Sequence, residues 1–401
     1  MTDRNGDIER LAELAVRFGA NVQPGQILVV GGEVGQEDLV RAIARAGYKA
    51  GARFVDAAYF DLLVKRERLL HAADDTLDFV PSWYGERLLA IGEQRCARVG
   101  LSGPTHPHAL DGVDADRAGR DQLPFLREAA KVVNDRTTNW SAIAGPSPGW
   151  ASLVFPDLSP AEAEDRLWEQ ILHVLRLDED DPVAAWQQRS ETLVGAAQRL
   201  TERRFDALHF EGPGTDLTVG LLPSSSWMAA RFETIDGIVH MPNLPSEEVF
   251  TTPDPARVDG HVRSTKPLEV HGAIVRGLHA RFEGGRAVSI EADENGDVLA
   301  GYARRDDGAC RLGEVALVDG EGRIGALDTV FYDTLLDENA ASHIALGSAY
   351  TFTVDDEADK ERANVSEIHI DFMIGAPDVA VTGVTREGDR VPVLVEGRWQ
   401  I

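Results

Sequence analysis

The sequence predicts an α/β N-terminal domain, with a parallel-type sheet and helices, followed by an α+β C-terminal domain rich in antiparallel strands. Helix-like and strand-like segments alternate through the first part of the chain, the pattern of a parallel layered fold. An acidic stretch at 178–182 then separates two long helical segments. From Phe205 onward the segments become short, β-branched or alternating, with frequent glycines. We therefore expect two domains, 1–181 and 182–401.

The spacing of apolar residues predicts the elements of the first domain in order. Helices are expected over 7–18 and 36–50, and strands over 26–30, 53–58, 98–101 and 140–144. Ser159 as cap, Pro160 at the first helical position and Glu162 closing a capping box predict a helix that ends near residue 175. A second long helix should end near Glu202 and lead into the second domain.

The second domain is expected to contain many short strands. Examples are 207–210, 216–219, 268–271 and 287–290. The run 333–350 is the exception, because it resembles a helix. If 341–350 is helical, His343 and Tyr350 lie two turns apart on one face, either beside a metal or simply packed in the core.

Composition excludes several classes of partner. A formal charge of −27 at pH 7 argues against nucleic acid, whose phosphates require a basic surface. No apolar run reaches the ~20 residues of a membrane helix, and residues 1–7 lack the apolar core of a signal peptide. Cys96 and Cys310 lie far apart without a CxxC pair, so we expect a reducing, cytoplasmic setting.

Common nucleotide and protease motifs are missing. The loop 31–35 lies between a strand and a helix, but it lacks the GxGxxG spacing of a dinucleotide site. The segment 145–149 lacks the GxSxG spacing of a serine hydrolase. There is also no HExxH pair, so a thermolysin-type zinc protease is not supported.

Possible metal ligands instead cluster in four short segments of the C-terminal half. They are Glu247 and Glu248, Glu314, Glu338 and His343, and His369 with Asp371. Histidines mixed with carboxylates suit Zn²⁺, Co²⁺ or Mn²⁺ in a site that activates water. Taken together, the segments indicate a two-metal hydrolase.

Each segment has its own physical argument. In the alternating run 368–372, His369 and Asp371 fall on one strand face, although such a pair alone equally fits a half-exposed polar face. Glu314 enters the apolar run 315–318, where a buried carboxylate needs a partner such as a cation.

The adjacent acids Glu247 and Glu248 follow Pro245, which breaks regular structure. One of them would bind metal while the other serves as general base, although a Glu-Glu pair alone is usually a surface feature. Glu338 lies five residues before His343. It could therefore join the site only from a turn that precedes a helix.

The chain resembles the M29 family of metallopeptidases, the aminopeptidase T group often labelled thermophilic metalloproteases. The similarity is densest at 243–253, 264–268, 308–318, 338–350 and 366–375. It implies a homodimeric aminopeptidase that removes N-terminal residues from peptides through water activated by two divalent ions, Zn, Co or Mn. The metal ligands implied are Glu248, Glu314, Glu338, His343, His369 and Asp371. In the mechanism that follows, Glu247 accepts the proton and Tyr350 is the catalytic tyrosine.

Two alternatives stay open at this point. A dipeptidase or amidase could use the same metal set, because substrate selectivity resides in the shape of the pocket. A non-catalytic metal-binding protein could keep the ligands without turnover.

Overall fold

The computed structural model describes residues 3–124, 126–270 and 273–401. The chain divides into two compact units. Unit 1 comprises Met1–Ser190, Ala230–Ser246 and Phe331–Leu335, and unit 2 comprises Glu191–Ala229, Glu247–Val330 and Leu336–Ile401. The sequence-based boundary at 181/182 stays a prediction. Among the described residues, no helix is both long and apolar enough to cross a membrane.

Unit 1 is built on a parallel five-stranded sheet, in the order β10-β4-β3-β1-β2. Its strands are β1 (Ile27–Glu33), β2 (Phe54–Phe60), β3 (Ala97–Ser102), β4 (Trp140–Ala144) and β10 (Asn243–Leu244). A short hairpin, β8 (Phe232–Glu233) and β9 (Val239–His240), lies outside this sheet. The expected strands of the first domain are thus confirmed.

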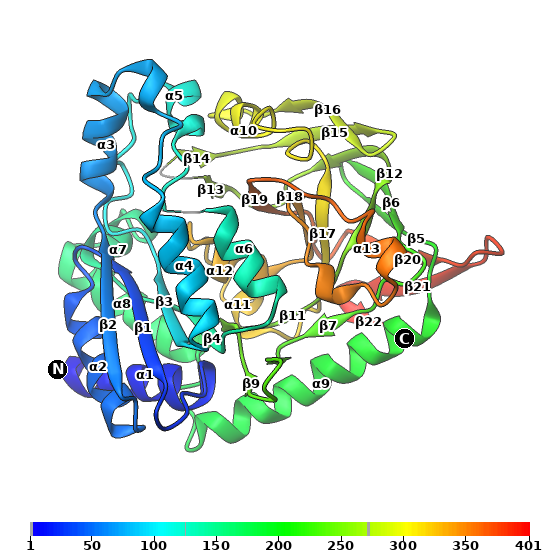
Figure 1. Ribbon diagram of the computed structural model, residues 1–401. Coiled ribbons are helices and arrows are strands. Elements are labelled where there is room, and N and C mark those ends of the chain that lie inside the picture. The colour runs from blue at the N-terminus through cyan, green and yellow to red at the C-terminus, as the bar shows by residue number, and fades with distance from the viewer. Residues whose placement is uncertain (1–2, 125, 271–272) are drawn as a thin grey trace. The chain divides into compact units, whose positions relative to one another are not determined.

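The helices of unit 1 precede, connect and follow these strands. They are α1 (Arg4–Leu14), which continues as a π-helical turn (Ala15–Gly19), α2 (Glu37–Lys49), α3 (Leu62–His71), α4 (Trp83–Glu93), α5 (Ala115–Arg120), α6 (Arg127–Asn134), α7 (Pro148–Val154) and α8 (Pro160–Val174), with a 3₁₀ turn at Asp74–Thr76. The chain runs from β1 outward to β2 and then back past β1 to β3. Right-handed crossovers therefore place α2 and α4 on opposite faces of the sheet, as Figure 1 shows.

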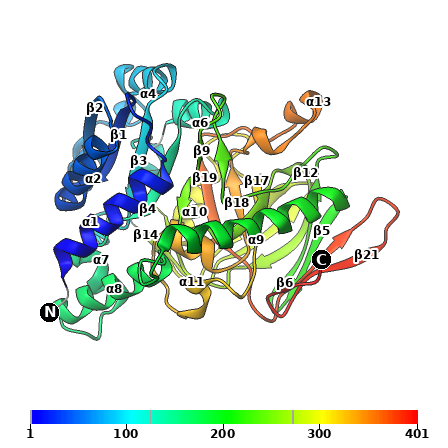
Figure 2. The same ribbon diagram turned by 90° about the horizontal axis from the view of Figure 1, so that it is seen from below.

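Two local features of unit 1 follow from its sequence, and the second of them, the capping box, was predicted. α2 packs closely on β1 because Gly47 has no side chain, since a Cβ there would lie 2.5 Å from Leu28 Cδ2. The capping box at the start of α8 is present, with Ser159 accepting from the Glu162 N–H and Glu162 accepting from the Ser159 N–H. The second long helix, α9 (Pro182–Arg203), is a single unbroken helix (Figure 2).

Unit 2 contains two larger antiparallel sheets. The five-stranded sheet has the order β19-β18-β17-β11-β7, and the eight-stranded sheet has the order β16-β15-β12-β6-β5-β20-β21-β22. The first is formed by β7 (Met228–Ala229), β11 (Glu248–Thr251), β17 (Leu312–Val318), β18 (His343–Gly347) and β19 (His369–Met373). The second is formed by β5 (Ala207–Gly212), β6 (Thr215–Leu221), β12 (Pro253–Arg263), β15 (His279–Glu283), β16 (Arg286–Glu291), β20 (Ala380–Val384), β21 (Arg390–Val395) and β22 (Arg398–Trp399).

The remaining elements of the C-terminal half are short. They are the antiparallel pair β13 (Leu268–Val270) and β14 (Ala273–Val275), the helices α10 (Gly296–Tyr302), α11 (Arg323–Ala326), α12 (Thr334–Asp337) and α13 (Glu357–Lys360), and 3₁₀ turns at Glu338–Ala340 and Thr351–Thr353. The four expected strands are present, although the last residue of 268–271 lies outside the described residues. The predicted combination of a parallel sheet with helices and a separate antiparallel part is confirmed.

The expected helix over 333–350 is wrong. Helical structure covers α12 and the 3₁₀ turn Glu338–Ala340, and β18 then pairs with both β17 and β19. All five residues of β18 are buried. A strand buried on both faces forms a short continuous apolar run, which periodicity alone cannot distinguish from a buried helix. His343 and Tyr350 therefore do not share a helical face.

Candidate metal centre

One face of the five-stranded sheet carries most of the candidate ligands. Directly paired residues in an antiparallel ladder share a face, and so do residues two apart on one strand. Glu248 pairs with Val318, Ala316 with His343, and Glu314 with Ala345. Asp371 pairs with Ala345, and His369 pairs with Gly347. The register alone thus places ligands from β11, β17, β18 and β19 on the same face.

Small residues between the ligands leave room on this face. Ala316, Ala345 and Gly347 occupy the positions that lie between or beside the acidic and imidazole side chains. The register of β17 shifts between Leu312 and Glu314. At Gly313 an added Cβ would lie 2.3 Å from the Gly347 carbonyl oxygen, so the two backbones meet where only glycine fits.

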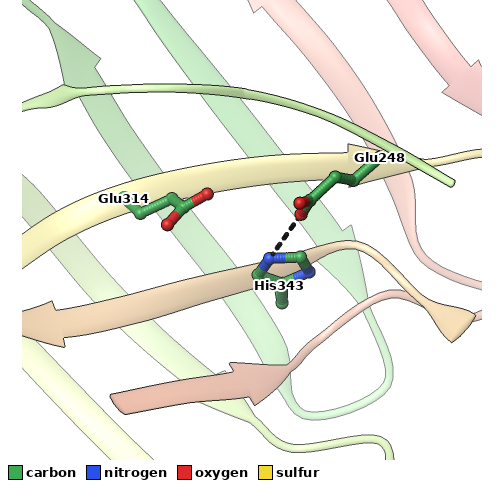
Figure 3. Close-up of side chains that lie close together, drawn as sticks. All are labelled: Glu248, Glu314 and His343. Carbon is green, nitrogen blue, oxygen red and sulfur yellow. Dashed lines mark ion pairs between the residues drawn. The ribbon is translucent and has the colours of Figure 1, made fainter. Parts of the chain in front are cut away.

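Three overlapping groups of side chains result, and within each group the ligand atoms lie within 4.8 Å of one another. The groups are Glu248, Glu314 and His343; Glu314, His369 and Asp371; and Glu338, His343 and Asp371. Figure 3 shows the first group, with Glu248 and His343 directed toward each other from different strands. The sequence-predicted ligands are therefore all brought together.

Three histidine–carboxylate contacts define the spacing of these side chains. His343 Nε2 lies 3.0 Å from Glu248 Oε2, and His369 Nε2 lies 3.1 Å from Glu314 Oε2. His369 Nε2 is also 3.5 Å from Asp371 Oδ1, which agrees with the predicted shared strand face. All the carboxylates and His343 are buried, and His369 is partly buried.

The other ring nitrogen of each histidine contacts a backbone carbonyl. His343 Nδ1 lies 3.2 Å from the Ala341 oxygen, and His369 Nδ1 lies 2.8 Å from the Ser348 oxygen. A carbonyl only accepts, so each Nδ1 carries the proton and donates it. Nε2 is then the nitrogen that faces the carboxylates and that, once it has lost its proton, can bind a metal, which is the usual outer-shell arrangement of a ligating histidine.

Glu338 reaches the group from outside the sheet. It begins the 3₁₀ turn that precedes β18, and its carboxylate lies with His343 and Asp371. The sequence predicted that Glu338 could contribute only from a turn before the next element. That geometry is present, although the next element is a strand rather than a helix.

Glu247 and Tyr350 do not belong to these groups, although Glu247 directly precedes the proposed ligand Glu248 in the sequence. Glu247 is fully buried, and its side chain passes over Gly322, whose ideal Cβ would lie 3.5 Å from it. The Tyr350 ring lies 5.0 Å from the His369 ring, and it also packs against Phe250 and Phe352. An aromatic cluster thus borders the acidic one.

The cluster has too little positive charge for its buried acids. Burial raises the pKa of Glu314 to about 7. Burial, together with the carboxylates of Asp371 and Glu248, raises the pKa of Glu338 well above its usual value. Burial alone would lower the pKa of His343, but the adjacent Glu248 carboxylate raises it to about 10. Groups of like charge are therefore held together away from water.

Two further observations show that a divalent cation fits. Glu248 Oε2 and Asp371 Oδ1 are buried, and neither accepts a well-aligned hydrogen bond among the described residues; each faces a histidine Nε2, at 3.0 and 3.5 Å. A buried carboxylate oxygen without a donor is costly unless a cation meets it. With imidazole nitrogen and carboxylate oxygen as donors, the set suits Zn²⁺, Co²⁺ or Mn²⁺.

The comparisons with known proteins agree with this chemistry. The family model described as thermophilic metalloprotease (M29) matches residues 4–399. The chain belongs to this M29 family. Membership makes it a metallopeptidase, a hydrolase of peptide bonds with a divalent metal cofactor, as predicted.

Curated M29 relatives align over almost the whole chain. Aminopeptidase T of Thermus aquaticus is 42% identical over 98% of both chains, and aminopeptidase T of Thermus thermophilus is 41% identical over 98% of both. Aminopeptidase 2 of Geobacillus stearothermophilus is 36% identical over 98% of this chain and 97% of the relative. The solved structure of wild-type AmpT from Thermus thermophilus matches with a TM-score of 0.88, at 40% identity, covering 99% of each chain.

Some residues of this M29 centre were missed from the sequence. Asn339 is fully buried, and its Oδ1 accepts a hydrogen bond from the Glu247 backbone N–H at 2.6 Å. Ser342 Oγ accepts from the Val318 N–H at 3.0 Å and so joins β17 to the start of β18. Their positions beside Glu338 and His343 were the one available signal, because polar residues flanking ligands often orient them.

Proposed function

We propose that this chain is a metal-dependent aminopeptidase that removes N-terminal residues from peptides by means of two divalent ions. The overlap of three ligand groups on one sheet face is the observation that carries the proposal. The proposed ligands are Glu248, Glu314, Glu338, His343, His369 and Asp371. Glu314 and Asp371 each belong to two groups, so either carboxylate could be shared between two ions, and Glu314 is our assignment for the bridge.

The charges support two ions rather than one. The groups contain four different carboxylates and two imidazoles. With the acids ionised and the imidazoles neutral, two divalent cations balance the four negative charges. Such ions, when bound, lower the pKa of a water molecule toward about 7 and polarise the scissile carbonyl. Zn, Co and Mn all suit this mixture of ligands.

Glu247 and Tyr350 take the two remaining roles. The Glu247 carboxylate accepts a proton from the attacking water, since it lies next to a ligand without being one. Burial raises the pKa of the Tyr350 phenol, so the hydroxyl keeps its proton. Tyr350 can therefore donate a hydrogen bond to the oxyanion that forms on the substrate carbonyl.

Selectivity for amino termini requires a further negative charge near the ions. A carboxylate other than the four proposed carboxylate ligands would hold the substrate's α-ammonium group, whereas an N-acetylated peptide offers no charge there. The aminopeptidase names of the relatives favour this assignment over a dipeptidase or a general amidase. We also propose a homodimer in the cytoplasm, which light scattering and cell fractionation would test.

Metal content and cleavage, measured on the same preparation, test the proposal. After dialysis we expect two ions per chain by elemental analysis, together with cleavage of a Leu-linked chromogenic amide. A chelator should stop this cleavage, and Co²⁺ or Zn²⁺ should restore it. Cleavage of N-acetylated peptides at a similar rate would instead indicate an amidase. Full metal occupancy without any cleavage would point to a non-catalytic metal-binding protein.

A further inference from the structure

We propose that Asn339 is a positioning residue that holds Glu247 and Glu338 in fixed relation to each other. The inference rests on the proposed function, in which Glu247 accepts the proton and Glu338 binds metal. Asn339 Oδ1 accepts the Glu247 backbone N–H at 2.6 Å. Its Nδ2 lies 3.5 Å from Glu338 Oε1 and donates toward it. One side-chain amide thus connects the two segments that carry the two acids.

An asparagine is suited to both contacts. A backbone N–H needs an acceptor, whereas a carboxylate needs a donor, and a primary amide offers both on one short, planar group. An aspartate would keep the acceptor, but it would place another negative charge beside Glu338. A leucine of similar size would offer neither partner. Asn339 and Glu247 are both 0% exposed, so water cannot replace the lost bond without a rearrangement.

The contact between Asn339 and Glu247 lies just outside the strand ladder. Strand pairing between β11 and β17 begins at Glu248, so the ladder does not fix the backbone of the residue before it. Gly322 lies beside the Glu247 side chain, where even an added Cβ would be at ordinary van der Waals distance, 3.5 Å. The hydrogen bond to Asn339 Oδ1 therefore fixes the orientation of the Glu247 N–H as well as its position.

Hydrogen exchange on the metal-free protein tests the contact without using activity. Asn339→Ala should speed deuterium uptake by the Glu247 amide, read in peptides that span 245–250. Asn139→Ala is the matched control, because Asn139 is also buried at 1% exposure and donates to the Ala20 carbonyl at 2.6 Å in unit 1. Equal uptake of 245–250 in wild type and Asn339→Ala would overturn the proposal.

A double-mutant cycle then tests whether Asn339 acts through Glu247. With two ions bound, Asn339→Ala should lower kcat about 10- to 100-fold, in the range seen when outer-shell partners of metal sites are lost, with little change in KM. In the Glu247→Gln background, the same substitution should lower kcat by less than about threefold, because coupled residues are not additive. Asn139→Ala should keep the wild-type kcat.

Two outcomes of the cycle would contradict the proposal. An equal loss of kcat in both backgrounds would mean that Asn339 acts independently of Glu247. A loss of thermal stability in Asn339→Ala with unchanged kcat would mean that the amide supports only the fold. Failure of the proposed function itself is detected separately, because the metal-loaded wild-type chain would then cleave no peptide before any variant is compared.

Discussion

His343 Nε2 lies 3.0 Å from Glu248 Oε2, although the strands that carry these two residues are not neighbours. β17 runs between β11 and β18, and the residue of β17 paired with His343 is Ala316. The contact thus spans an intervening strand whose side chain is a single methyl group. We infer that ligand geometry depends on small residues in the sheet as much as on the ligands themselves.

Enlarging Ala316 should therefore weaken metal binding. Ala316→Val adds two methyl groups between Glu248 and His343, and overpacking of this kind forces neighbouring side chains away from their rotamers. We expect metal affinity, measured by equilibrium dialysis, to fall at least about tenfold, the scale of perturbed outer shells. Ile344→Val is the control, since Ile344 is buried on the opposite face of β18. Comparable losses in both variants would contradict the argument.

Replacing Glu314 by glutamine should remove activity and leave the fold intact. Glu314 belongs to two of the three ligand groups, so Glu314→Gln weakens both ion positions while it keeps the shape of the side chain. We expect metal content to fall below two ions per chain, and kcat to fall at least about 1000-fold, the scale of losing a principal electrostatic group. Wild-type kcat in this variant would show that Glu314 is not a ligand.

The same variant makes a second, opposite prediction for stability. In the metal-free protein Glu314 lies among other buried carboxylates, and burial already raises its pKa to about 7. A neutral amide there removes a desolvated acid and its repulsion with Asp371 and Glu248, while its oxygen can still accept a hydrogen bond from His369 Nε2, which lies 3.1 Å from Glu314 Oε2. The metal-free Glu314→Gln chain should therefore melt at the same temperature as metal-free wild type or above it. Differential scanning calorimetry in a chelator measures this, and a clearly lower Tm would be inconsistent with it.

Removing the Tyr350 hydroxyl should affect the chemical step alone. Tyr350→Phe keeps the ring packing against His369, Phe250 and Phe352 but loses the proposed donor to the oxyanion. We expect kcat to fall about 100- to 1000-fold, as for other single oxyanion donors, with metal content unchanged. Tyr302→Phe, at a buried tyrosine of α10, should keep wild-type kcat. Metal loss in Tyr350→Phe would assign the phenol to the metal shell instead.

Residue order allowed four strands of the parallel sheet of unit 1 to be predicted, because helical segments separate β1, β2, β3 and β4 from one another. The fifth strand, β10, was not predicted, since it joins the sheet from a segment far along the chain. Residue order also placed His369 and Asp371 on one face, since period two is a local property of any strand. Both predictions depend only on residues that are close together in the sequence. They therefore do not indicate which segments pack against each other.

The error at β18 has a physical cause. His343–Gly347 is buried on both faces, so the alternation that marks a half-exposed strand is missing. What makes this segment a strand is hydrogen bonding to β17 and β19, two segments distant in the sequence. Asn339 was missed for a related reason, because its contact with Glu247 exists only after distant segments have been brought together. Both the strand β18 and the Asn339–Glu247 contact depend on segments that are distant in the sequence.

His240 in unit 1 should make the fold sensitive to acid. It is 4% exposed, its Nδ1 donates to the Ile238 carbonyl at 3.4 Å, and its Nε2 has no hydrogen-bond partner among the described residues. The rings of Trp140 and Phe232 pack beside it. Burial lowers the pKa of His240 from 6.5 to about 4.

The sign of the pH effect follows from this lowered pKa. Below pH 6.5 the unfolded chain binds a proton at His240 that the folded chain does not bind until near pH 4. The contribution of this residue to stability is therefore complete above pH 6.5 and declines as the pH falls toward 4, by up to about 1.4 kcal/mol per pH unit. His240→Phe, which keeps an aromatic ring among Trp140 and Phe232, should remove the decline.

The difference between the two proteins is the quantity to measure, since other groups titrate equally in both. In urea unfolding at pH 7.5 and pH 5, the stability of His240→Phe relative to wild type should rise by about 1–2 kcal/mol on acidification. A difference that does not change with pH would mean that the folded protein protonates His240 as readily as the unfolded chain does. Its buried Nε2 would then have to reach water or an acceptor, which the packing of Trp140 and Phe232 around it opposes.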